Sequence, residues 1–334
     1  MTMNSKIKHI EYHLPDKIVD NEILVREFQE WTADKIEKKT GIRERHIAGE
    51  NETSLDLAIP ACNKIFSQYD KNKIDCLIFC TQTPDYYMPA TACVLQERLG
   101  LGKNTGAFDI NLGCSGFIYG LAIAKGFIAA GVSKSVLLVT AETLSKFVHP
   151  LDKTNRTLFG DAAAATIIEA DDEKGIFEFV LGTDGSGAEN LIVRNGGMRN
   201  KINPFPEDIA DEQGNVRNEN NIYMDATEIF NFTTAEVPKA FSEILNKNNT
   251  SIDKINYVIF HQANKFLNDY LRKMLGIAEE KYYLNLLHTG NTVSVTIPIA
   301  LKDSLDNHLI KHGDYVLLLG FGVGYSWGGT IIRI

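Results

Sequence analysis

The sequence lacks the features that mark membrane and secreted proteins. No run of residues approaches the roughly 18 consecutive apolar residues that a membrane-spanning helix needs. No apolar stretch follows the start "MTMN", so we expect no signal peptide and no insertion into a membrane. The five cysteines are odd in number and include no C-x-x-C pair. That usage fits a reducing cytoplasm better than a disulfide framework or a zinc site.

Basic residues are also in the minority. With 34 Lys and Arg against 43 Asp and Glu, the formal net charge is -9, which argues against a general nucleic-acid-binding protein. The 334 residues are 44% hydrophobic and 23% charged, as in ordinary globular proteins, and suffice for two domains with a large core. We therefore expect a cytoplasmic protein with neither nucleic acid nor membrane among its partners.

Two segments of the chain recur in the same order at nearly the same spacing. Ile78 in "CLIFCT" matches Ile259 in "YVIFHQ" at an offset of 181, and Val136 in "SVLLVT" matches Val316 in "YVLLLG" at an offset of 180. Between these blocks, "GAFDINLGCSGFIYGLAIA" has a counterpart in "YYLNLLHTGNTVSVTIPIA". Matched blocks in one order predict two halves of similar fold.

Each half shows the same succession of strands and helices. "CLIFCT" and "YVIFHQ" are apolar without alternation, as in strands covered on both faces. Helical spacing follows in "ACVLQERLGL" and "FLNDYLRKMLGI", and a further strand then precedes the Cys114 segment or the His288-to-Thr292 segment. "FIYGLAIAKGFIAAG" carries a single charge, so we expect a helix buried on all sides. The sequence thus predicts an α/β protein with mostly parallel sheets and a helical layer between them.

The stretch at about 194–221 departs from this plan. It is polar, contains Gly and Pro, and shows no period, so we expect a long surface insertion. We place the first half at 1–175 and the second half, which carries the insertion, at 176–334.

Three polar residues stand at matched places in the two halves. Cys114 follows "AFDINLG", His261 ends "YVIF", and Asn291 follows "YYLNLL". Function gathers at the carboxyl ends of strands in open parallel sheets, so two similar halves would bring these residues together in one cleft. Singly, each has a plainer interpretation: a small buried cysteine, a core histidine and a turn asparagine. Their joint placement favours a reactive site, with His288 as the competing histidine.

The surroundings of Cys114 suit chemistry on an acyl group. A thiol at a helix N-terminus lies near free backbone N–H groups and the positive end of the helix dipole, so we expect a stabilised thiolate. Gly113 and Gly116 would let an acyl carbonyl approach closely. A neutral histidine and an asparagine amide can both donate to a developing oxyanion, and "LGFGVGYSWGG" offers further backbone donors.

Several further motifs occur in an order that resembles the β-ketoacyl-acyl carrier protein synthase III family of the thiolase superfamily. They are "KKTGIRERHIA", the cysteine segment, "FGDAAAA", "HQAN", "GNT" and "FGVGYSWGG". The resemblance covers nearly the whole chain and implies a thiolase-like five-layered αβαβα fold in a cytoplasmic homodimer. It also implies a condensing acyltransferase of fatty acid biosynthesis or of a specialised acyl pathway. Such an enzyme needs no metal and no cofactor beyond its CoA thioester substrate.

The same resemblance assigns roles to individual residues. Cys114 would take the acyl group from acyl-CoA, while His261 and Asn291 bind the thioester carbonyl of malonyl-acyl carrier protein and stabilise the enolate formed on decarboxylation. The backbone N–H groups of Cys114 and Val323 would hold the tetrahedral oxyanion. Met88 matches a residue that reaches into the partner subunit's channel. The substrate-binding positions are Met88, Leu144, Phe159, Met224, Asn264 and Phe321, and those of the CoA or carrier face are Lys39, Thr40, Lys153, Lys265, Arg272 and Lys273.

Three other interpretations remain open at this point. A relative within the superfamily could use the same Cys, His and Asn set to transfer the acyl group to a different acceptor. A cysteine hydrolase could use the set as a triad, although the duplicated α/β plan counts against it. A silent scaffold or binding module is opposed by the presence of all three polar residues.

Overall fold

The apolar runs of the first half form a five-stranded sheet. In this computed structural model, which describes residues 3–334, its strands follow the order β1-β7-β6-β4-β5. The strands are β1 (Asn4–His13), β4 (Cys76–Cys80), β5 (Gly106–Ile110), β6 (Ser135–Glu142) and β7 (Ala162–Asp171). Every residue of β4 and β6 is buried, because helices cover both faces of this sheet.

The second half forms a four-stranded sheet in the order β13-β14-β15-β8. Its strands are β8 (Val180–Thr183), β13 (Tyr257–Phe260), β14 (Tyr315–Gly322) and β15 (Ser326–Arg333). The repeat reappears in the strand pairing. Cys76 of β4 lies opposite Val136 of β6, and Tyr257 of β13 lies opposite Val316 of β14, both in parallel pairs. The division between residues 175 and 176 stays a prediction.

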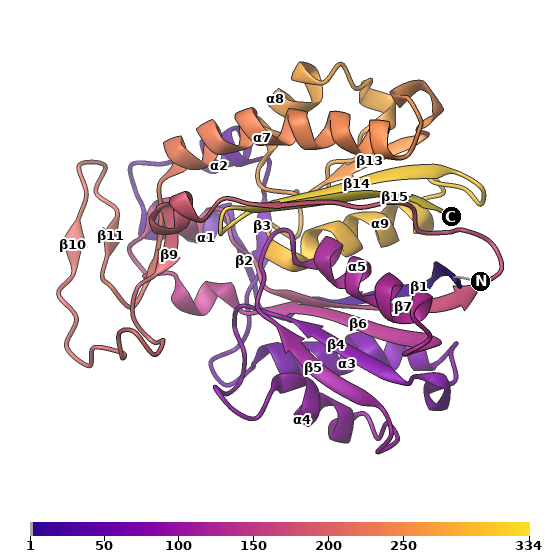
Figure 1. Ribbon diagram of the computed structural model, residues 1–334. Helices are drawn as coiled ribbons and strands as arrows, with labels where there is room; N and C mark the ends of the chain where they lie inside the picture. Colours follow the sequence, from indigo (N-terminus) through magenta and orange to yellow (C-terminus); the bar gives the residue numbers. More distant parts are fainter. Residues whose placement is uncertain (1–2) are drawn as a thin grey trace.

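Helices separate and cover the two sheets (Figure 1). Between the sheets lie α5 (Gly116–Ala129) and α9 (Thr296–Asp306), and α5 contacts both β6 and β14. The outer faces are covered by α3 (Ser54–Phe66) and α4 (Thr91–Arg98) on the first sheet, and by α7 (Ala226–Lys247) and α8 (Lys265–Met274) on the second. The expectation that α5 is buried on all sides is wrong, because only seven of its 14 residues are buried and Gly126 is exposed near its C-terminal end. The five-layered αβαβα fold of two similar halves is confirmed.

Shorter elements complete the described chain. They are α1 (Asn21–Glu27), α2 (Ala33–Thr40), α6 (Lys153–Arg156), β2 (Ile18–Asp20), β3 (Glu44–His46), β9 (Leu191–Val193), β10 (Ile209–Ala210), β11 (Val216–Arg217) and β12 (Ile222–Met224), with 3-10 helices η1 (Lys71–Lys73), η2 (Leu144–Phe147), η3 (Gly185–Asn190), η4 (Ile252–Lys254), η5 (Glu279–Lys281) and η6 (Val293–Val295). None of the helices within residues 3–334 has the length and apolar character to span a membrane.

The segment at about 194–221 lies largely at the surface. It contains the β10–β11 hairpin, which projects from the layered body in Figure 1, and Phe205 is 88% exposed. A partly buried ion pair ties its base to the body, with Arg217 Nε 2.6 Å from the carboxylate of the buried Asp152.

The expectation of mostly parallel sheets is wrong. Of the seven strand pairings described in the two main sheets, three are parallel and four are antiparallel. The β14–β15 pair shows the cause, because residues 323–325 alone join these strands. A connection this short can only return the chain antiparallel, whereas a parallel neighbour needs a long crossover.

The strand expected before His288 is also absent from the described second sheet. Residues 282–287 make only a single bridge, Tyr282 opposite Val258. The Gln262 side chain takes the place of a backbone ladder there. Its Oε1 accepts from the Asn285 backbone N–H at 2.8 Å, and its Nε2 donates to the Tyr283 carbonyl oxygen at 3.3 Å.

Candidate active site

The polar residues at matched strand ends line one cavity. Cys114 lies between β5 and α5, His261 follows β13 directly, and Asn291 lies just before η6. All three line a cavity of about 820 Å³, which residues of α2 and α8 also line. The structure therefore brings together side chains that are 147 and 30 positions apart in the sequence.

Glycines let the chain pack tightly around Cys114. A Cβ at Gly322 would lie 2.6 Å from the Cys114 sulfur, and one at Gly113 would lie 2.3 Å from Gln82 Oε1. A Cβ at Gly116 would lie 2.4 Å from the Cys80 sulfur. Such separations exclude any side chain at these positions unless the neighbours move, so the small residues around the thiol serve close approach.

The Cys114 thiol is protonated in the resting site. Burial raises its pKa to about 12, although the Val323 backbone N–H acts in the opposite direction. The thiol is only 8% exposed, and α5 begins two residues further along the chain. Desolvation thus opposes the thiolate that the helix end is expected to stabilise, and that stabilisation stays a prediction.

His261 is neutral and held in one orientation. Burial lowers its pKa to about 3, and only 2% of the residue is exposed. Its Nδ1 lies 2.8 Å from the Thr296 hydroxyl, which donates its own proton to the Val293 carbonyl oxygen at 3.1 Å. We therefore assign the ring proton to Nδ1, which donates to Thr296, and Nε2 remains an acceptor toward the cavity.

The Asn291 amide is fixed by its backbone neighbours. Its Oδ1 accepts from the Val293 N–H at 2.9 Å, and its Nδ2 donates to the Ala263 carbonyl oxygen at 3.3 Å. One amide hydrogen is left for a ligand. Val293 has φ 57°, which a β-branched residue rarely adopts. The surrounding contacts thus hold a strained residue beside the amide.

Most of the residues expected to bind substrate line the same cavity. Those on its wall are Phe159, Met224, Asn264 and Phe321. Leu144 is not on the wall but belongs to the buried cluster that contains Cys114 and Phe159. Met88 is 83% exposed on a surface loop and does not reach the cavity of its own chain.

The expected CoA or carrier face is only partly at the cavity. Lys39, Thr40, Lys265 and Lys273 line it. Lys153 instead pairs with Glu30, and Arg272 lies 3.6 Å from the Glu279 carboxylate, so both lie off the cavity wall.

Aromatic residues that are not among the site residues expected from the sequence line the same cavity. Trp31 lines it, with the Lys39 ammonium 5.6 Å from its ring centroid. Phe230 of α7 stacks on Phe266 of α8 at 6.0 Å and contacts Tyr270 at 5.2 Å between centroids. Trp31 precedes α2 and lies outside the repeated blocks, and the other rings have ordinary helical spacing, so no pattern distinguished them.

His288 is not part of the cavity. Its side chain is 56% exposed and its Nδ1 lies 2.9 Å from a carboxylate oxygen of Glu44. The position of His261 directly after a buried strand was the useful signal.

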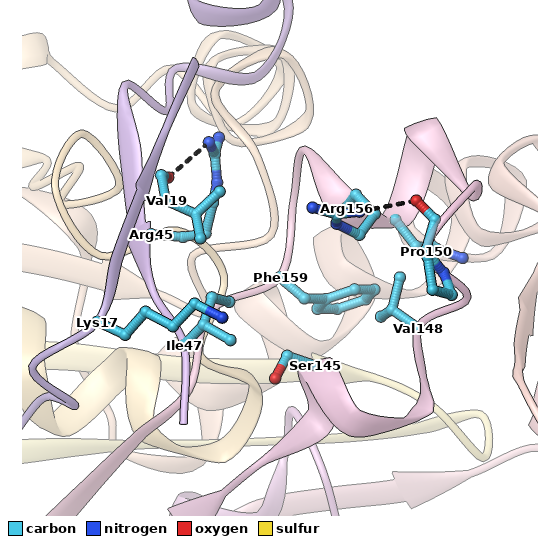
Figure 2. Close-up of a pocket in the computed structure, with 10 residues that line it drawn as sticks. Lys17, Val19, Arg45, Ile47, Ser145, Val148, Pro150, Arg156 and Phe159 are labelled. Carbon is cyan, nitrogen blue, oxygen red and sulfur yellow. Dashed lines mark hydrogen bonds between the residues drawn. The ribbon is translucent and has the colours of Figure 1, made fainter. Parts of the chain in front are cut away.

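A second, smaller cavity of about 200 Å³ shares Phe159 with the first (Figure 2). Figure 2 shows Arg45 donating to the Val19 carbonyl oxygen and Arg156 donating to that of Pro150, at 3.0 and 2.7 Å. These cations therefore serve the local structure. None of the three polar residues lines this space, and the larger cavity is therefore the candidate reaction site. Within residues 3–334, no three His, Cys, Asp or Glu side chains are grouped as metal ligands.

Comparisons with known proteins identify relatives of both halves. The family "3-Oxoacyl-[acyl-carrier-protein (ACP)] synthase III" matches residues 108–185, and its C-terminal counterpart matches 245–334. A beta-ketoacyl-[acyl-carrier-protein] synthase III from Clostridium perfringens (strain 13 / Type A) is 39% identical over 334 residues, covering 99% of both chains. A crystal structure of a 3-oxoacyl-(acyl-carrier-protein) synthase III matches with a TM-score of 0.97 and 45% identity, covering 99% of this chain and 100% of that one. The 3-oxoacyl-(acyl-carrier protein) synthase of Burkholderia xenovorans LB400 matches with a TM-score of 0.92 and 35% identity, covering 100% and 95%.

Proposed function

The chain belongs to the 3-oxoacyl-[acyl-carrier-protein] synthase III family, and from this we propose that Cys114 carries the acyl group in a decarboxylative condensation. It is an acyltransferase of the β-ketoacyl-acyl carrier protein synthase III type, which joins an acyl group to malonyl-acyl carrier protein. Its products are β-ketoacyl-acyl carrier protein, CoA and CO2. The supporting observation is that Cys114, His261 and Asn291 line one cavity. There Cys114 has a proton to give, His261 Nε2 can accept one, and Asn291 has an amide hydrogen to donate.

The first half-reaction needs an acceptor for the Cys114 proton, because burial keeps the thiol protonated. The free Nε2 of His261 takes this proton, and the thiolate attacks the carbonyl carbon of acyl-CoA. Backbone N–H groups of Cys114 and Val323 donate to the tetrahedral oxyanion. The carbon–sulfur bond to CoA then breaks, and the CoA thiolate takes the proton from His261, which returns to its neutral form.

The second half-reaction needs His261 as a hydrogen-bond donor at Nε2. The malonyl carboxylate favours the imidazolium form, so His261 takes a proton from solvent, and its Nε2 and Asn291 Nδ2 both donate to the thioester carbonyl. Loss of CO2 leaves its electron pair in an enolate held by these donors. The enolate carbon attacks the Cys114 thioester, and the expelled thiolate takes the proton from His261. Each turnover consumes one proton, which enters from solvent in the second half-reaction.

The remaining assignments follow from position and from the family. Lys39, Thr40, Lys265 and Lys273 would meet the CoA or carrier arm at the cavity. Lys153 and Arg272 lie off its wall and would act on the outer carrier face. Because residues of this chain supply the nucleophile, the base and the hydrogen-bond donors for these steps, we propose no cofactor beyond the CoA thioester.

We also propose a cytoplasmic homodimer. Met88 is exposed in the single chain and, by the family resemblance, would reach the acyl channel of the other subunit. Met88 forms an exposed apolar run with Tyr86 and Tyr87, and a contiguous run of this kind is typical of a protein–protein interface.

Intact-protein mass spectrometry after exposure to a panel of acyl-CoAs tests the proposal. We expect one acyl group on Cys114, none on Cys114→Ala, and release of CO2 when malonyl-acyl carrier protein is added to the loaded enzyme. An acyl group on another residue would contradict the assignment of Cys114. Loading without CO2 release would favour the alternative of a relative that uses another acceptor.

A further inference from the structure

A buried carboxyl group lies under the reaction site without a role in the steps above. Glu142 ends β6 and is fully buried. Its oxygens accept hydrogen bonds from the Gln82 backbone N–H at 3.1 Å, the Thr83 hydroxyl at 3.2 Å and the Ser294 hydroxyl at 3.0 Å. Within residues 3–334 it forms no ion pair, so its partners are all neutral.

Two of these partners pack against the turn that carries Cys114. Gln82 Oε1 would lie 2.3 Å from a Cβ at Gly113, and Ser294 Cβ would lie 3.6 Å from a Cβ at Gly116. The turn at 113–116 is therefore held between Gln82 and Ser294. Glu142 binds both of them, one from the loop after β4 and the other from the second half of the chain.

Ser294 also adjoins the residue that orients Asn291. It directly follows Val293, whose N–H holds Asn291 Oδ1 and whose φ of 57° is strained. A strained residue persists only where its surroundings fix it. The hydrogen bond from Ser294 to Glu142 is one such restraint on η6.

We propose that Glu142 is a positioning residue, whose carboxyl group joins the turn that carries Cys114 to the segment that orients Asn291. The inference rests on the proposed function of these two residues. It adds a single buried group that couples the sites of the two half-reactions, although it touches neither substrate.

The charge of Glu142 gives this role a pH-dependent signature. Burial raises its pKa to about 8, against the lowering effect of the Gln82 N–H. The titratable groups around it are Asp161, Cys80 and Cys114, and ionised Glu142 raises the pKa of Cys114. Glu142 is therefore mostly protonated at neutral pH, and its negative charge opposes the Cys114 thiolate only at higher pH.

The test compares Glu142→Gln, which resembles the protonated carboxyl group, with Glu142→Ala and Ser294→Ala. The rate of Cys114 alkylation by iodoacetamide is measured near pH 6 and near pH 9. We expect Glu142→Gln to match the wild type near pH 6 and to react measurably faster near pH 9, because it lacks the negative charge that raises the pKa of Cys114. Ser294→Ala keeps the carboxyl group and should show no such gain.

The second measurement is CO2 release from malonyl-acyl carrier protein. We expect Ser294→Ala to release CO2 about tenfold more slowly than the wild type, which is the effect of losing one hydrogen bond. Glu142→Ala should be slower still. Glu142→Gln should restore part of that loss. Ser304→Ala removes a buried serine hydroxyl of α9, bonded to the Ala300 carbonyl oxygen, and is the matched control.

Each measurement can overturn the inference on its own. If Ser294→Ala decarboxylates at the wild-type rate, the positioning role is refuted, even if the Glu142 variants fail to fold. Equal alkylation of Glu142→Gln and wild type near pH 9 would refute the coupling to Cys114. A purely structural role would lower all rates together with stability, without the selective gain at high pH. If wild-type Cys114 accepts no acyl group, the proposed function fails instead.

Discussion

Gly322 in the second half of the chain lies directly against Cys114 in the first. A Cβ built on Gly322 would be 2.6 Å from the sulfur and 2.7 Å from Cys114 Cβ. Gly322 ends β14, the strand that the repeat relates to β6. Cys114 of one half is thus covered by backbone of the other, which explains both its access to Val323 N–H and its low exposure.

Gly322→Ala should slow acyl loading of Cys114 by about 10- to 100-fold, because the methyl group occupies the space beside the sulfur and displaces it from the attacking position. The rate is read from the mass of the acylated protein. Gly126→Ala is the control, since a Cβ there meets no atom within 4 Å. Equal loading by the two variants would contradict the close contact.

Alkylation of Cys114 should accelerate continuously as pH rises. Its pKa is raised to about 12, so the protonated thiol predominates below that value and the thiolate fraction grows with each pH unit through the neutral range. Rates with iodoacetamide between pH 6 and 10 check this, with Cys114→Ala subtracting the other cysteines. If the alkylation rate instead levels off below the ordinary thiol pKa of about 8.5, Cys114 is a stabilised thiolate, as the sequence predicts.

The two half-reactions should respond differently to substitution. Cys114→Ala should lose acyl loading yet still release CO2 from malonyl-acyl carrier protein. Asn291→Ala should load normally but decarboxylate about 10²- to 10³-fold more slowly, as when one oxyanion donor is removed. His261→Ala should lose both, because Nε2 accepts the thiol proton and later donates. Normal loading by His261→Ala would show that another group takes the proton.

Stability should fall as Glu142 ionises. Its pKa is raised from 4.5 to about 8 in the folded protein, so its contribution is complete below the unfolded value and is lost as pH rises through the folded one. The free energy of unfolding is measured with denaturant for the wild type and for Glu142→Gln. The wild-type value minus the variant value should decline between these two pKa values, by up to about 1.4 kcal/mol per pH unit. A difference that rises or stays flat with pH would show that the carboxylate is stabilised in the fold.

Met88→Trp should shorten the longest acyl chain that the enzyme accepts, if Met88 enters the partner's channel. Met is unbranched and adaptable, whereas Trp fills more of a narrow space. Loading with acyl-CoAs of increasing length measures the effect, and sedimentation establishes the dimer. A monomer, or an unchanged length profile, would remove this role.

The sequence by itself determined the duplicated plan and the residues at its strand ends. The apolar runs at Ile78 and Ile259 predicted equivalent strands, and the structure pairs them in equivalent registers with β6 and β14. These features are local, because apolar runs and repeat spacing depend on neighbouring residues. Cys114, His261 and Asn291 followed from their places after such runs.

Only the tertiary structure decided the protonation states and the walls of the site. Burial raises the pKa of Cys114 and lowers that of His261, and this burial comes from segments far apart in the chain, such as Gly322 against Cys114. Trp31 reaches the cavity through the packing of segments outside the repeat. Glu142 gains its partners from both halves at once. Desolvation and hydrogen bonding of this kind depend on distances across the fold, which no local pattern of residues records.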